Sequence, residues 1–133
     1  MWITSRIKPV MLIAGLLTST MLYAAIAPQA ALQSTFGESL TGPVAEIVVR
    51  NWGALIGLVG MMLIYGAYDP PSRRLALIVA ALSKAVFVTL VFVNGGRYLE
   101  QAGVAVAVDA VFVCLFVWYL AVSPRETLSG RAL

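Results

Sequence analysis

Histidine is absent from this chain of 133 residues, and cysteine occurs once, as Cys114. The absence of histidine excludes metal and haem sites that need imidazole ligands, together with Ser-His and Cys-His nucleophiles. A single cysteine excludes an internal disulfide and a CxxC redox centre, and a lone thiol in an apolar run behaves mainly as a small hydrophobic side chain. The sequence therefore predicts no metal, no cofactor and no catalytic residues, and it favours a protein that is not an enzyme.

Charged residues are also scarce in this sequence. Only 11% of the residues are charged, whereas 61% are hydrophobic, and a soluble domain usually carries about 25% charged residues. Such a chain cannot form a soluble surface, so the lipid bilayer is its expected environment. The net charge of +3 comes from basic residues scattered near the ends of apolar runs. This scatter is typical of membrane topology, and we expect no nucleic-acid partner.

Long apolar runs are the main feature of the sequence. They predict an all-α polytopic membrane four-helix bundle in a single transmembrane domain, residues 1–133, with spans at about 9–27, 46–68, 75–94 and 103–122. Residues 28–42 are too polar to span and too apolar for a free linker. They predict a short periplasmic interfacial helix that either lies on the bilayer or caps the mouth of the bundle. A signal-peptide cleavage after Ala27 is disfavoured by Pro28, so we expect the first span to be retained.

The distribution of basic residues predicts the orientation of the spans. An N-terminus in the cytoplasm places six Lys or Arg residues on that side and two, Arg50 and Arg97, on the other. The six are Arg6, Lys8, Arg73, Arg74, Arg125 and Arg131. Because cytoplasmic loops carry an excess of Lys and Arg, both the N-terminus and the C-terminus are expected in the cytoplasm.

Lys84 stands at the centre of the apolar run 75–93. An ammonium near the bilayer midplane costs roughly 2.5–3.5 kcal/mol, so it normally has a partner. The next run offers one candidate, Asp109, which in an antiparallel hairpin lies roughly 3 Å from the level of Lys84 at 1.5 Å per residue. We predict a direct ion pair. Two roles stay open: a structural pair that closes the bundle, or part of a site for a ligand, ion or proton.

A second polar group lies near the outer ends of the spans. Its members are Glu46, Arg50, Asn51, Asn94 and Arg97. Long polar side chains at this depth commonly extend toward the lipid headgroups. The alternative is that they form the mouth of a cavity whose floor is the predicted ion pair.

Small residues on every span suit a compact bundle, because close packing in lipid relies on them. The second span contains Gly53, Gly57 and Gly60, which include a GxxxG spacing. This spacing serves either packing within one chain or a homo-oligomer, and we favour packing within the chain.

Short motifs mark the boundaries between the predicted spans. Ala27-Pro28 and Phe36-Gly37 follow the first span, Arg50-Asn51-Trp52-Gly53 opens the second, and Pro70-Pro71-Ser72-Arg73-Arg74 and Gly95-Gly96-Arg97 flank the third. This layout resembles the DoxX-like group of small four-span bacterial inner-membrane proteins. The resemblance implies a location in the bacterial inner membrane. Members of that group look like accessory subunits or membrane factors, some of them associated with quinone-linked oxidoreductases.

Three functions follow from these observations. The leading hypothesis is a non-catalytic accessory subunit or assembly partner of a membrane complex. The main alternative is the binding of a small lipophilic ligand, a quinone or another lipid, above Lys84 and Asp109. A small transporter or channel is the third, and it is disfavoured because four short spans offer few polar positions for a pore.

Overall fold

The computed structural model describes residues 2–94 and 96–123, and all regular structure in these ranges is helical. The four long elements are the first span, which comprises α1 (Trp2–Ser19), η1 (Thr20–Leu22) and α2 (Tyr23–Ile26), and then α4 (Pro43–Tyr68), α5 (Pro70–Asn94) and α6 (Leu99–Val122). Each of the four is long and apolar enough to cross a membrane. The two remaining elements are α3 (Pro28–Phe36) and η2 (Gly96–Tyr98). The predicted all-α four-helix bundle is confirmed.

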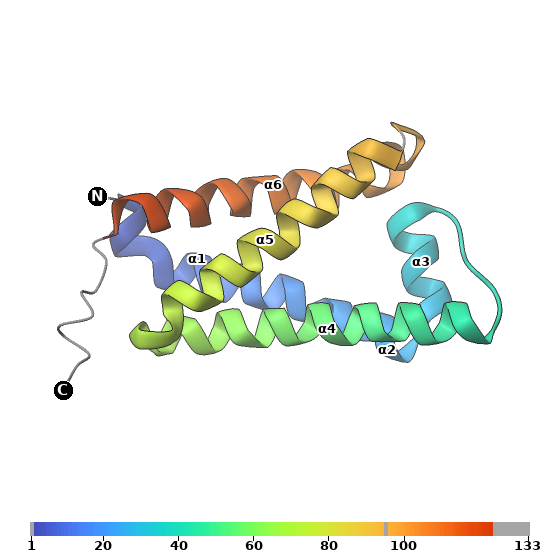
Figure 1. Cartoon of the computed structure of the whole chain (residues 1–133), viewed down its shortest axis with the longest axis horizontal. Helices are drawn as coiled ribbons and strands as arrows, with labels where there is room; N and C mark the ends of the chain where they lie inside the picture. Colours follow the sequence, from blue (N-terminus) through green and yellow to red (C-terminus); the bar gives the residue numbers. More distant parts are fainter. Residues whose placement is uncertain (1, 95, 124–133) are drawn as a thin grey trace.

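The helices run back and forth along one long axis. The start of α1 and the end of α6 lie at one end of the bundle, and α3 lies at the other (Figure 1). We call these the N-terminal end and the α3 end. Helix α1 packs mainly on α4, and α5 packs on α4 and α6. Arg125 and Arg131, which contribute to the predicted charge bias, fall outside the described residues, as does Gly95.

The turn between α4 and α5 consists of Asp69 alone. Pro70 ends one helix and opens the next, since a proline in the first turn lacks only an N–H that would have no helical partner. Arg73 closes the turn by donating from Nε to the Gly66 carbonyl at 3.0 Å and from Nη2 to the Ala67 carbonyl at 2.7 Å. Helix α5 therefore begins at Pro70, before the apolar run from Leu75 that predicted the third span.

Helix α3 lies across one end of the bundle. The backbone turns at Ala27, and α3 ends at Gly37, whose φ of 75° is the left-handed conformation that glycine adopts at helix ends. Ala31 and Leu32 are buried, and α3 packs against α2, α4 and α6. Residues 28–36 of the expected interfacial segment are thus helical and pack against one end of the bundle.

Glycines set the close contact between the first span and α4. A Cβ added to Gly60 would lie 2.5 Å from the backbone nitrogen of Ser19, and one added to Gly15 would lie 2.8 Å from the Gly60 carbonyl oxygen. A Cβ on Gly53 would lie 2.6 Å from that of Ala24. These distances are too short for any larger residue, so the glycine face of α4 serves packing within the chain, as favoured above.

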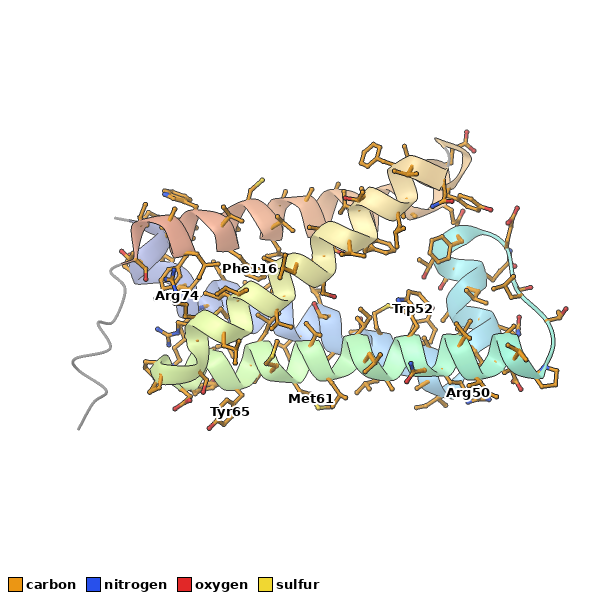
Figure 2. The ribbon with its side chains drawn as sticks, viewed as in Figure 1. Arg50, Trp52, Met61, Tyr65, Arg74 and Phe116 are labelled. Atoms are coloured by element: carbon orange, nitrogen blue, oxygen red, sulfur yellow. The ribbon has the colours of Figure 1, made fainter. Side chains whose placement is uncertain are left out.

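The interior is packed unevenly along the bundle. The dense part lies toward the N-terminal end and contains Ile7, Met11, Ala14, Leu63, Ala67, Ala76, Leu77, Ala80, Ala81 and Phe116. Toward α3, the buried cluster is smaller and contains Val91, Ala102 and Val106, while Ala24, Ala31, Leu32 and Val49 are buried outside both clusters. Met61 and Tyr65 point away from the bundle, as expected of a lipid-facing surface (Figure 2). The looser half is where space for a ligand is found.

Candidate functional site

Lys84 and Asp109 form the predicted direct ion pair. The Lys84 Nζ lies 2.9 Å from Asp109 Oδ1, and the two side chains are 8% and 21% exposed. The pair joins α5 to α6 near the middle of both helices. The depth argument from the sequence therefore holds, because two residues at the same level of a helical hairpin meet when they share a face.

The first span supplies a third member, which the sequence argument missed. Lys84 Nζ also donates to Thr18 Oγ1 at 3.1 Å, and Thr18 is buried. In the sequence Thr18 has the appearance of an ordinary small packing residue. Its position midway along the first apolar run was the signal that it could reach the depth of Lys84. The ammonium thus holds three helices together.

The hydrogen-bonding capacity of Lys84 exceeds these two contacts. An ammonium has three N–H donors, and among the described residues Asp109 and Thr18 accept two of them. The nitrogen also lies 5.8 Å from the centroid of the Phe112 ring, near the outer limit of a cation–π contact. One donor is therefore available to a further acceptor.

A cavity of about 280 Å³ lies beside this ion pair, and we call it the inner cavity. Its polar lining comes from Thr18, Thr20, Thr35, Ser83, Lys84 and Asp109. The rest is apolar or aromatic: Leu17, Met21, Trp52, Ile56, Val59, Phe87, Ala105, Val108 and Phe112. Every long helix and α3 contribute to its wall, and the residues come from all parts of the chain. Convergent polar groups in a mostly apolar chamber are typical of a small-molecule site.

A second cavity of about 390 Å³, here the outer cavity, lies toward α3. It is lined by Leu32, Phe36, Glu38, Ser39, Leu40, Trp52, Phe87, Leu90, Val91, Asn94 and Tyr98. Trp52 and Phe87 line both cavities and so form their common wall. Figure 2 shows Trp52 pointing from α4 into the space between the helices. The Phe36 ring packs on both, with centroid distances of 6.2 Å to Trp52 and 6.4 Å to Phe87.

The predicted mouth residues separate in the structure. Asn94 lines the outer cavity, whereas Glu46, Arg50 and Asn51 line neither cavity. The Arg97 side chain lies outside the described part of the structure.

Arg50 has a different structural role. It pairs with Glu46 at 3.4 Å and donates to the carbonyls of Ala25 at 2.5 Å and Ile26 at 3.2 Å. Those carbonyls end the first span, where they lack helical partners. The guanidinium therefore closes the end of α2, much as Arg73 closes the end of α4.

The described residues offer no cluster for a metal ion. Within 2–94 and 96–123, no three His, Cys, Asp or Glu side chains come together. Cys114 is exposed on α6 and lines neither cavity. The chemistry available in the cavity is thus hydrogen bonding by an ammonium, a carboxylate and several hydroxyls.

Comparisons with protein-family models, curated proteins and solved structures give no match. What the protein does must therefore be inferred from the cavity and the groups that line it.

Proposed function

We propose that this membrane protein binds a small, uncharged lipophilic molecule, such as a quinone or another lipid, in the inner cavity. The observation that carries the proposal is the space of about 280 Å³ that reaches Lys84 and Asp109. A purely structural ion pair needs no such space, because protein interiors are close-packed and hold few voids larger than a water molecule. The half of the bundle toward the N-terminal end is densely packed. The same chain therefore contains both a close-packed region and the open space beside the ion pair.

The charges of the site favour an uncharged ligand. Lys84 and Asp109 compensate each other at 2.9 Å, so an ionised ligand would add an unpaired charge to a low-dielectric interior, at considerable cost. A carbonyl or ether oxygen can accept the remaining N–H of Lys84. The rings of Phe87 and Phe112 offer apolar walls for a flat or branched head group.

The packing of the bundle speaks against the channel hypothesis for a single chain. The dense cluster around Leu63, Leu77 and Phe116 lies between the inner cavity and the N-terminal end. A conducting pore needs a polar path through both halves. An accessory role in a membrane complex and membership of the DoxX-like group stay predictions, and ligand binding is compatible with both.

The double variant Lys84→Met/Asp109→Leu tests the proposal. We expect it to fold, because apolar replacement of a buried ion pair is often neutral or stabilising. Its affinity for a decyl-substituted benzoquinone should fall on the order of tenfold or more, since the polar anchor is lost. Quenching of tryptophan fluorescence in lipid nanodiscs measures this, and mass spectrometry of the purified wild type identifies co-purifying lipids.

Thr89→Val is the matched control, because the Thr89 hydroxyl bonds to the Ala85 carbonyl of its own helix and lines neither cavity. It should bind the quinone like the wild type. A double variant that folds and binds as tightly as the wild type would overturn the proposal. A stoichiometric protein partner in the same preparation would support the accessory role.

The orientation gives a further prediction, which rests on the distribution of basic residues. We propose that the N-terminal end faces the cytoplasm of a bacterial cell and α3 faces the periplasm. Ser5 lies near the start of α1, Ser39 lines the outer cavity toward α3, and both are exposed. Each is nearly isosteric with cysteine. In a Cys114→Ala background, Ser39→Cys should react with a membrane-impermeant maleimide on intact cells, and Ser5→Cys only after the membrane is permeabilised. The reverse labelling would invert the orientation.

A further inference from the structure

The rim of the inner cavity shows where it opens. Among its lining residues, only Leu17 and Thr20 of the first span and Ala105 and Val108 of α6 are exposed, and all the others are buried or half-buried. Leu17 is 52% exposed and Val108 is 37% exposed. The cavity is thus accessible sideways, between the first span and α6. We call this opening the lateral window.

The course of the helices explains the lateral window. The first span and α6 are in contact at the N-terminal end, where Trp2 and Trp118 stack with ring centroids 6.3 Å apart. Farther along, η1 and α2 pack on α4, and Figure 1 shows the first span leaving α6 as it runs toward α3. Thr35 of α3 bounds the cavity at that end. The two helices therefore part at mid-length, beside the ion pair.

The window faces lipid and not water. Its rim residues lie within helices that are long and apolar enough to span the membrane, and three of the four are apolar. The outer cavity differs, because its exposed lining includes Glu38, Ser39 and Asn94. A hydrocarbon chain can lie in the lateral window without leaving an apolar medium, whereas a water-soluble molecule would have to enter the apolar layer of the bilayer to reach it.

We infer that the ligand is a chain-bearing amphiphile that reaches the inner cavity from the bilayer through the lateral window. This inference rests on the proposed function. The uncharged head group lies against Lys84 and Asp109, and the acyl or isoprenoid chain passes between Leu17 and Val108 into the surrounding lipid. Such a ligand needs room inside the protein only for its head, which suits a cavity of about 280 Å³.

Quenching of Trp52 fluorescence by a bound quinone measures ligand binding. Trp52 lines both cavities, whereas Trp2 and Trp118 stack on each other at the N-terminal end. The inner cavity is singled out by variants at Ala105, which lines the inner cavity and not the outer one. The double replacement Trp2→Phe/Trp118→Phe leaves Trp52 as the sole tryptophan, since the chain has three. Two probes with the same head are compared in nanodiscs of stated lipid composition: a benzoquinone that carries a decyl chain and a methyl-substituted benzoquinone without one.

Ala105→Phe narrows the lateral window, and Val104→Phe is its control, because Val104 is 79% exposed and lines neither cavity. We expect Ala105→Phe to weaken quenching by the decyl quinone on the order of tenfold at equal membrane concentration. Quenching by the chainless quinone should change less than about twofold, within the range of near-neutral contacts, and Val104→Phe should change neither. If Ala105→Phe does not fold, Leu17→Phe narrows the opposite side of the rim and should give the same result.

The outcomes separate the two proposals. Unchanged binding of the decyl quinone to both window variants would overturn the lateral route and leave the proposed function standing. An equal loss for both probes would also overturn it, because the variants would then act on the head-group site. If neither probe quenches Trp52 in the parent protein, the proposed function itself fails.

Discussion

Replacing Asp109 with leucine is expected to lower the free energy of unfolding by about 3–5 kcal/mol, because Lys84 would keep a buried charge without its counter-ion. Its remaining acceptor would be the Thr18 hydroxyl at 3.1 Å, which cannot compensate an ammonium that is only 8% exposed. Lys84→Met should cost a similar amount, since the Asp109 carboxylate is then left unpaired. Unfolding by dodecyl sulfate in mixed micelles, followed by the loss of helical circular dichroism, measures each change.

The double variant Lys84→Met/Asp109→Leu should regain most of this loss. Neither charge is then buried, and the apolar side chains occupy similar volumes. Thr18→Val should cost less than either single charge variant, on the order of 1 kcal/mol, as hydrogen bonds between membrane helices usually do. A cost below about 1 kcal/mol for both single charge variants would show that the pair is not desolvated, since that is the range of exposed ion pairs.

Stability and ligand binding together define the role of the pair. A structural pair predicts that the double variant keeps both its fold and its quinone affinity. A binding site predicts that it keeps the fold and loses the affinity. The cavity beside the pair is the reason that we expect the second result.

Gly60→Ala is expected to destabilise the bundle by about 1–3 kcal/mol, the usual range for overpacking. The added Cβ would lie 2.5 Å from the Ser19 backbone nitrogen and 2.8 Å from the Gly15 carbonyl oxygen. Because these are backbone atoms, α1 and α4 must separate to accept it. This cost outweighs the gain in helix propensity from glycine to alanine, which is at most about 1 kcal/mol. The same unfolding assay in mixed micelles reports the difference.

Gly103→Ala is the matched control for this prediction. Gly103 lies in α6, and a Cβ added there would meet nothing within 4 Å. It should therefore be neutral or slightly stabilising, by up to about 1 kcal/mol, because alanine favours the helix. Equal stabilities for the two variants would mean that α1 and α4 are not in the close contact that their glycines allow.

The sequence by itself determined the helices and the level at which their polar residues meet. Apolar runs long enough to cross a bilayer are unambiguous, and Pro28, Pro43 and Pro70 mark helix starts because proline fits the first turn. The pairing of Lys84 with Asp109 followed from the rise per residue in a hairpin. The cost of a buried charge made a partner necessary, and the fourth span offered only one.

Rotation of the helices about their axes was decided only by the tertiary structure. Thr18 joins Lys84, and Trp52 separates the two cavities, because of the faces that α1 and α4 turn inward. Hydropathy does not distinguish these faces, since lipid and the interior of the bundle are equally apolar. For the same reason the sequence alone did not show that Arg50 closes the end of α2 and lines neither of the two cavities.

The loose half of the bundle is likewise a property of packing. Glycines allow the first span to pack closely on α4. Because of this contact, the part of the first span nearer to α3 lies away from α6, and the lateral window opens between the two. No single residue encodes that opening, because it depends on which of two neighbouring helices the first span approaches more closely. The spans, and the depth of each polar residue along its span, are local properties of the chain. The inner cavity and the lateral window arise instead from the distances between helices.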